Sequence, residues 1–233
     1  MEKVHSDLIR IELSGVNVFL WTGQGGPTLI DTGYPWTFNK LLDELKQVGV
    51  QPAELQRIII THADLDHIGG LKGLTELSDA VVACHTAEAA FLEGKRPLPV
   101  RKGMMSWLLG VFNRIVAHIY KPDVDQVHIL LLDKETTPEG FSVVYLPGHS
   151  PGQIGLYHKS EGIFIAGDAL INRNNHLSLP PSLFTFNEAQ AVESLEKLRK
   201  LHYETACFGH GPCLKNNADR KISTFLDALN QNT

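Results

Sequence analysis

Seven side chains of metal-ligating types follow one another along this chain in an order and spacing that suggest a two-metal hydrolase. Four of them fall within the segment T-H-A-D-L-D-H at 61–67, and the other three stand in the glycine-flanked turns G-H-S-P-G, A-G-D-A and G-H-G-P. Neutral imidazoles and carboxylates are the usual nitrogen and oxygen ligands for zinc and related ions. A neighbouring glycine lets the backbone bend tightly and bring the side chain into a crowded site. The candidate ligands are His62, Asp64, Asp66, His67, His149, Asp168 and His210.

This motif order resembles the metallo-β-lactamase-fold superfamily, whose members carry an HxHxDH motif, a single downstream His, a bridging Asp and a final His. The resemblance runs from D-T-G at 31–33 to G-H-G at 209–211, and so covers nearly the whole chain. It is closest to the branch that contains glyoxalase II and the acyl-homoserine lactonases. It implies an α/β fold, the four-layer αββα sandwich, and a hydrolase that cleaves an ester-like acyl bond with a metal-bound hydroxide.

The resemblance also implies how the ligands divide between two divalent ions. One ion is bound by His62, Asp64 and His149, the other by Asp66, His67 and His210, and Asp168 bridges them. Asp66 is in addition the candidate catalytic residue, because it can orient the nucleophile or handle a proton while it binds metal. Zinc is the expected metal, with manganese or iron as alternatives.

Asp64 is the position at which the chain departs from the family motif, which has His there. With a bridging hydroxide, three ligand carboxylates balance two divalent cations, whereas a His would leave the site with one positive charge. If Asp64 binds metal, we expect a weaker Lewis acid and a site in which manganese or iron competes better with zinc. The alternative is that Asp64 turns away and only accepts a hydrogen bond.

Four further residues are candidates for supporting roles. Asp31, in D-T-G, either braces the ligand loop or serves only in its turn. Tyr34 and Trp36 follow it and either line the substrate pocket or pack in the core. Arg173, just after Asp168, either holds a substrate carboxylate or remains a solvated loop residue.

Length and composition set broad limits. A chain of 233 residues fits one domain, and the net charge of -5 argues against nucleic acid as a partner. We find no signal peptide and no apolar stretch of about 20 residues, so no membrane partner is expected. Three scattered cysteines suit a reducing cytoplasm. The expected partner is a small-molecule substrate. The sequence leaves undecided whether the chain also forms a homodimer.

The hydrophobic pattern predicts the elements that position these residues. Residues 94–126 break the pattern and are predicted to form an inserted helical hairpin within a single domain of 1–233, bordering the site, a dimer contact or simply the core. Strands are predicted at 8–13, 16–21, 28–31, 57–60, 80–84, 127–132, 141–146, 153–158, 162–166 and 205–208. Helices are predicted at 36–48, 68–77, from 84 to about 92, at 187–201 and at about 215–230.

Two other classes of function remain as alternatives. The same fold includes mononuclear-iron dioxygenases and di-iron oxidoreductases, but the first need only part of this ligand set and the second usually carry an additional flavin domain. A non-catalytic metal-binding member would be expected to have lost ligands. Within the hydrolases, Ile171 stands where many acyl-homoserine lactonases have a Tyr, which sets this chain apart from that pattern.

Overall fold

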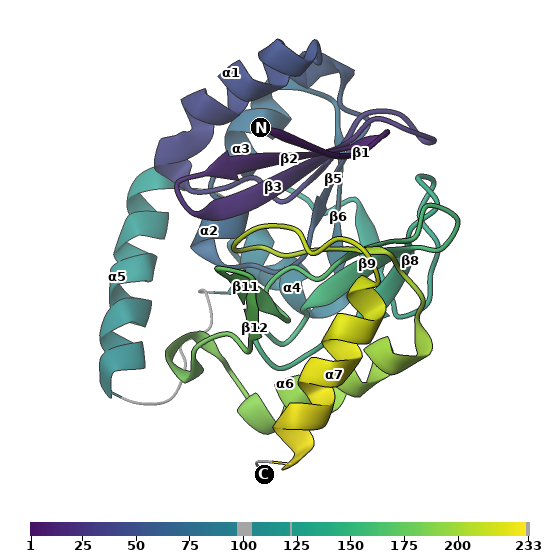
Figure 1. Ribbon diagram of the computed structural model, residues 1–233. Helices are drawn as coiled ribbons and strands as arrows, with labels where there is room; N and C mark the ends of the chain where they lie inside the picture. The colour runs from purple at the N-terminus through teal and green to yellow at the C-terminus, as the bar shows by residue number, and fades with distance from the viewer. Residues whose placement is uncertain (97–103, 122, 232–233) are drawn as a thin grey trace.

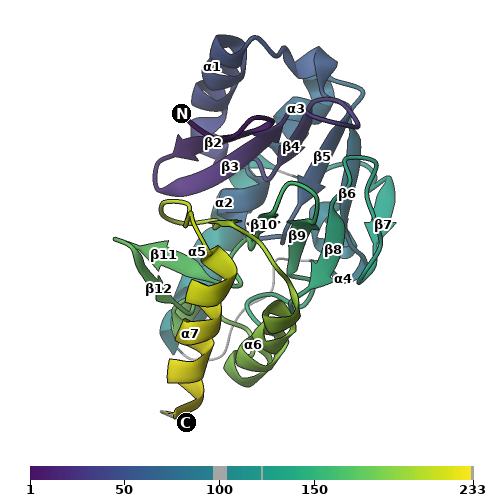
Figure 2. The same cartoon turned by 45° about the vertical axis from the view of Figure 1, so that its right-hand side comes forward.

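The computed structural model describes residues 1–96, 104–121 and 123–231, and these form two facing sheets with helices on both outer sides (Figures 1 and 2). The order of layers is helices, sheet, sheet, helices. This is the expected αββα arrangement. The prediction of an inserted helical hairpin falls partly outside the described residues, at 97–103 and 122.

The first sheet has seven strands in the order β1 to β7. Strands β1 to β4 pair antiparallel, while β4 to β7 pair in parallel. The strands are β1 (Glu2–His5), β2 (Leu8–Leu13), β3 (Val16–Trp21), β4 (Thr28–Ile30), β5 (Arg57–Ile60), β6 (Val81–His85) and β7 (Ile129–Leu131).

The second sheet has the order β13-β10-β9-β8 and lies beside a separate hairpin of β11 and β12. Because β9 is antiparallel to both β8 and β10, and β13 is parallel to β10, the strands β8, β10 and β13 all run in one direction. The strands are β8 (Ser142–Tyr145), β9 (Ile154–His158), β10 (Ile163–Ile165), β11 (Ile171–Arg173), β12 (His176–Ser178) and β13 (Thr205–Cys207).

Helices cover the outer face of each sheet. On the first sheet these are α1 (Phe38–Val48), α2 (Leu65–Ile68), α3 (Leu71–Leu77) and α4 (Thr86–Leu92), and on the second α6 (Glu188–Leu195) and α7 (Ala218–Gln231). Short 3-10 turns are η1 (Pro35–Thr37), η2 (Pro52–Glu54), η3 (Ser182–Phe184) and η4 (Glu196–Lys200). Asn187 caps α6 as expected, since its side chain accepts a hydrogen bond from the Gln190 N–H at 3.1 Å.

Three apolar clusters hold these layers together. The central one lies between the two sheets and includes Trp21, Ile59, Phe141 and Ile165. The outer two bury the apolar faces of α1 and α3 against the first sheet and those of α6 and α7 against the second. Burial of this apolar surface on both faces of each sheet is the main source of stability.

Two features differ from the sequence prediction. The described part of 94–126 contains one helix, α5 (Met104–Tyr120), which stands against the side of the molecule (Figure 1). The hairpin of β11 and β12 was not predicted, because strands of three residues are too short to show an alternating pattern. In the described part of the chain, no helix has the length and apolar character needed to cross a membrane.

Candidate active site

The candidate ligands come from loops that meet at one edge of the two sheets. His62 follows β5, while the loops after β8, β10 and β13 carry His149, Asp168 and His210. Because β8, β10 and β13 run in the same direction, their following loops reach the same edge. A hydrogen bond from the Ile154 N–H to the carbonyl of Thr61, 3.0 Å long, joins the two sheets there.

One group of ligand atoms gathers around the carboxylate of Asp64. Its Oδ2 lies 3.2 Å from Nε2 of His149 and 3.8 Å from Nε2 of His62. Asp64 stands at the N-cap of α2, yet its side chain makes no cap hydrogen bond there. Asp64 therefore points toward the two imidazoles, as a metal ligand at this position would.

A second group gathers around Asp66, in the first turn of α2. Its Oδ2 lies 3.3 Å from Nε2 of His210 and 3.8 Å from Nε2 of His67. The four-residue helix α2 thus directs Asp66 and His67 toward one point, while Asp64, just before it, faces the other group.

Asp168 lies between the two groups. Its Oδ1 is 3.5 Å from Nε2 of His67, and its Oδ2 is 3.1 Å from Nε2 of His210 and 3.9 Å from Nε2 of His149. Gly209 leaves room for this arrangement, because a Cβ at that position would overlap the Asp168 carboxylate. The structure brings together all seven candidate ligands, with Asp168 in the position expected of a bridge.

The donor set fits metal ions better than it fits a closed network of hydrogen bonds. Among the described residues, the buried Nε2 atoms of His62 and His67 and Oδ1 of Asp168 have no hydrogen-bond partner. Buried polar atoms are normally satisfied, and a pair of cations would satisfy these. The ligand atoms form three groups, and within each group all the atoms lie within 4.8 Å of one another. The groups are His62 with Asp64 and His149, His62 with His67 and Asp168, and Asp66 with His67 and His210.

Hydrogen bonds behind the site fix the orientation of the imidazoles. Oδ2 of Asp31 lies 2.8 Å from Nδ1 of His67, and the same carboxylate accepts from the N–H and hydroxyl of Thr61 at 2.8 and 2.7 Å. Nδ1 of His210 lies 2.8 Å from the carbonyl oxygen of Gly15. Each partner directs the Nε2 of its imidazole into the site, as is usual for metal-binding histidines. Asp31 is therefore a brace rather than only a turn residue.

Glu88 is a supporting residue that the sequence did not single out. It is fully buried on α4 and accepts hydrogen bonds from the Ala63 N–H at 3.0 Å, the Ser150 hydroxyl at 2.8 Å and the Gly152 N–H. These donors belong to the loops that carry His62 and His149. Glu88 ties two ligand loops together, although burial raises the pKa of its carboxyl group.

Without metal, the close packing of carboxylates and imidazoles redistributes protons in the site. Burial and the neighbouring imidazoles hold the pKa of His62 well below its usual range. Burial opposes the charging of His67 and His210, but the surrounding carboxylates together outweigh it. Asp168, Asp31 and Asp66 raise the pKa of His67 to about 9, and Asp168 and Asp66 raise that of His210 to about 11. Despite burial, the charges of the same two imidazoles hold the pKa of Asp168 far below its usual range.

A pocket opens over these ligands. Tyr34 and Arg173 line it, as the sequence suggested, whereas Trp36 is half exposed and stacks on the Tyr34 ring with the centroids 4.4 Å apart. Trp36 therefore supports Tyr34 and is not among the residues that line this pocket. Ile171, which the sequence analysis singled out, also lines it, and so does Asn113, in agreement with the prediction that the segment 94–126 borders the site. The lining residues that the sequence did not indicate are Leu65, Pro180, Pro181 and Phe184.

The chain belongs to the metallo-beta-lactamase superfamily, whose family model matches residues 11–210. It is 31% identical over 207 residues to the probable metallo-hydrolase YflN of Bacillus subtilis, covering 78% of this chain and 74% of that protein. It is 27% identical over 209 residues to the N-acyl homoserine lactonase of Bacillus thuringiensis, with the same coverage of 78% and 74%.

Solved structures show the same fold. The metallo-beta-lactamase family protein TTHA1429 from Thermus thermophilus matches with a TM-score of 0.69 and 23% identity, over 96% of this chain and 78% of that one. TTHA1623 in a di-iron-bound form matches with a TM-score of 0.63 and 25% identity, over 89% and 93%.

Proposed function

We propose that this protein is a binuclear metallohydrolase that cleaves an ester-like acyl bond in a lactone, thioester or related carboxylic derivative. The observation that carries the proposal is the position of Asp168 between two groups of ligands at the base of a pocket. The similarity to metallo-hydrolases and to an N-acyl homoserine lactonase supports the reaction class.

The expected metal is zinc. The three carboxylates in the ligand set and the similarity to a protein with a di-iron-bound form support iron as the main competitor, with manganese next. When bound, two divalent ions supply an activated water nucleophile and a Lewis acid for the acyl carbonyl. The fit of the donor set supports His62, Asp64 and His149 on one ion, and Asp66, His67 and His210 on the other.

Tyr34 is the residue of this chain best placed to assist the acyl oxygen. It lines the pocket, and burial together with the charges of Asp66 and Asp168 raises the pKa of its hydroxyl, which therefore stays protonated. A protonated phenol can donate a hydrogen bond to an oxygen that gains negative charge. Ile171 cannot do this, so we propose that Tyr34 takes the role that a Tyr at position 171 would have.

Arg173 supplies a positive charge to the same pocket. It is exposed at the end of β11, and a guanidinium can bind a carboxylate through two parallel hydrogen bonds. We propose that Arg173 favours substrates with an anionic group several atoms from the scissile bond. Asp66 would hold or move a proton near the attacking water, since its carboxylate faces both the His210 imidazole and the pocket.

Metal analysis and a substrate panel test this proposal directly. We expect two divalent ions per protomer, and hydrolysis of lactones or thioesters in preference to phosphodiesters. His67→Ala should lose one ion and most of the activity, because it removes one of the three side chains proposed to bind the ion held by Asp66 and His210. Full activity with a single tightly bound ion would overturn the binuclear assignment, and activity only on phosphodiesters would overturn the substrate class.

Tyr34→Phe tests the proposed donor. We expect kcat to fall by about a hundredfold to a thousandfold with the metal content unchanged, since the loss of one preorganised donor costs a rate of that order. Trp36→Leu is the matched control, because it removes the stacked ring and leaves the hydroxyl. If Trp36→Leu lowers kcat as much as Tyr34→Phe does, the ring and not the hydroxyl matters.

A further inference from the structure

Two cysteine side chains meet at the base of the loop that carries His210. The thiol of Cys213 donates a hydrogen bond to Sγ of Cys207, and the two sulfur atoms are 3.2 Å apart. Both cysteines are free thiols. The spacing of the two cysteines in the sequence does not form a C-x-x-C motif, so it is the fold that brings the two sulfurs together.

The backbone explains why these two side chains meet. Ala206 and Leu214 pair as antiparallel neighbours and exchange two hydrogen bonds of 2.8 Å each. The next residues along the two segments, Cys207 and Cys213, therefore stand opposite each other with their side chains on one face. Ala206 and Leu214 pack in the outer apolar cluster, whereas both cysteines pack in the cluster between the sheets. Opposite residues beside a hydrogen-bonded pair have Cα atoms about 4.5 Å apart, which a disulfide can span.

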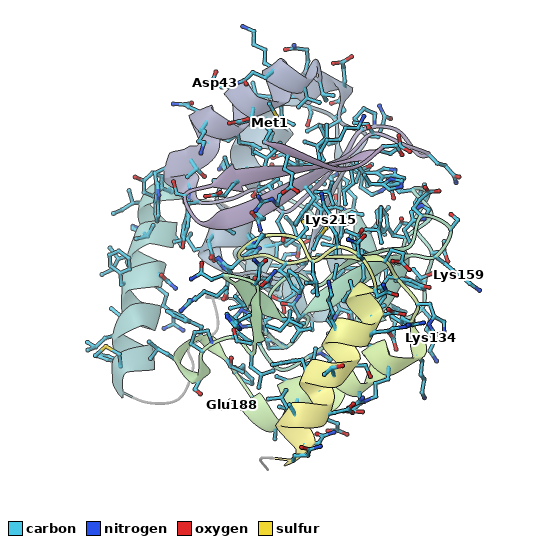
Figure 3. The ribbon with its side chains drawn as sticks, in the orientation of Figure 1. Met1, Asp43, Lys134, Lys159, Glu188 and Lys215 are labelled. Carbon is cyan, nitrogen blue, oxygen red and sulfur yellow. The ribbon has the colours of Figure 1, made fainter. Side chains whose placement is uncertain are left out.

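The two thiols differ in their access to solvent. Cys207 is completely buried, and burial together with the hydrogen bond from Cys213 raises the pKa of its thiol well above the usual range. Cys213 is half-buried, and Lys215, two residues further along and labelled in Figure 3, is exposed. A small oxidant can therefore reach the Cys213 sulfur first, with Cys207 already beside it as the second thiol.

We propose that Cys207 and Cys213 form a redox modification site, at which a peroxide converts the two thiols into a disulfide. The Cys213 sulfur attacks hydrogen peroxide and breaks its O–O bond, so that Cys213 becomes a sulfenic acid, and its thiol proton leaves with the other oxygen as water. The Cys207 sulfur then attacks the sulfenic sulfur to form the S–S bond, and its proton leaves with the hydroxyl group as a second water. The two sulfurs lose two electrons in all, and these reduce the peroxide.

The disulfide closes a ring, residues 207–213, that contains the candidate ligand His210. The loop is already in position in the thiol form, since the Asn172 N–H donates to the carbonyl of His210 at 3.2 Å and the imidazole faces Asp168. Because the sulfurs are in contact in that same arrangement, the bond can form without moving His210 out of the site. A closed ring leaves fewer conformations to a detached loop, so His210 should leave the site less readily. This effect rests on the proposed function, because it takes His210 as a metal ligand.

Cys84 provides a comparison within the same chain. It is fully buried on β6, its thiol donates to the carbonyl of His85 at 3.3 Å, and it packs in the outer cluster of the first sheet. A cysteine in this setting behaves as a small apolar residue. Cys213 differs from it in being accessible and in having a second sulfur beside it.

Peroxide treatment of the zinc-loaded protein, followed by alkylation of free thiols and peptide mass spectrometry, tests the redox site. Trypsin releases both cysteines in one peptide, residues 201–215, which the disulfide makes lighter by two hydrogens and protects from alkylation. We expect this product, and we expect dithiothreitol to reverse it. Cys213→Ser should leave Cys207 as a free thiol, whereas Cys84→Ala should form the disulfide as the unmodified chain does. Free thiols in the treated peptide, or oxidation of Cys213 to a sulfinic acid with Cys207 still free, would overturn the site.

The rate at which a chelator removes zinc measures the effect on His210. We expect the oxidised protein to lose zinc about threefold more slowly than the reduced protein, or slower still. The difference should vanish in Cys213→Ser and persist in Cys84→Ala. A disulfide that forms but leaves the release rate unchanged, or raises it, overturns the effect on His210. A protein that binds no metal overturns the proposed function, and the peptide measurement alone then decides the redox site.

Discussion

Asp64 occupies the position where the family motif has a His, and its carboxylate lies between two imidazoles of the candidate site. If it binds metal, its negative charge offsets part of the charge felt by a bound water, which then ionises at a higher pH. Asp64→His should therefore shift the rise of kcat/KM with pH downward and favour zinc over manganese. The measurement is a pH–rate profile of both proteins, each reconstituted with each metal.

The control for this substitution is a protein that is fully folded and fully loaded with metal. An unchanged acidic limb and an unchanged metal preference under those conditions would show that Asp64 is not a ligand. The structure supports a ligand role through geometry, since the side chain does not cap α2 and faces His149 at 3.2 Å.

Helix α4 supports the site through Glu88. Its carboxylate joins the loop of Ala63, which precedes His67, to the loop of Gly152, which follows His149. Glu88→Gln replaces one carboxylate oxygen, which accepts a hydrogen bond, by an NH2 group that would face another donor. We therefore expect the free energy of unfolding to fall by about 1–3 kcal/mol. Metal retention should weaken as well, because the two loops are less firmly joined. Urea unfolding and competition with a chelator measure the two effects.

Glu12→Gln is the matched variant, because Glu12 is exposed on β2 and the substitution makes the same change of charge. If both variants lose metal equally, the effect comes from net charge and not from the tie between the loops.

The elements also show how far sequence patterns reach. The bounds of β2, β3 and β5 are those predicted, because each is a clear apolar or alternating run between turn residues. The ligand cluster was found because its residue types and glycine-flanked turns are local. Glu88 was missed because its partners, Ala63 and Gly152, lie 25 and 64 residues away in the chain, and no local pattern marks such a contact.

The stability of the whole molecule should depend on pH, because two imidazoles of the site bind protons in the metal-free protein. The pKa values of His67 and His210, about 9 and about 11, lie above the ordinary value. In the metal-free protein these charged imidazoles stabilise the fold fully below their unfolded pKa, and this contribution is lost as the pH rises through the two folded values. Metal must displace the same protons, so metal affinity should rise over this range.

Thermal melts of the chelator-treated protein from neutral to alkaline pH check this prediction, with the metal-loaded protein alongside. We expect the Tm of the metal-free protein to fall as the pH rises from the ordinary His pKa of 6.5 up to the two folded values, and the difference from the metal-loaded protein to widen. A metal-free Tm that rises over that interval would contradict the assignment of these protons.

Opposite ends of the chain meet behind His210. The Asn17 N–H donates to the carbonyl of Gly209 at 2.7 Å, and the Asn17 side-chain amide donates to the carbonyls of Phe208 and Gly211 at 2.9 and 2.6 Å. Lys215, labelled in Figure 3, pairs with Glu2 at 2.9 Å in the same region.

During synthesis, the hairpin of β2 and β3 leaves the ribosome long before the loop that must dock on it. Contacts so distant in sequence form slowly, because a long loop has to close first. A nascent chain can therefore hold only part of its ligand set until residue 210 has left the ribosome, and the last of the ligand loops to dock is the one that carries His210.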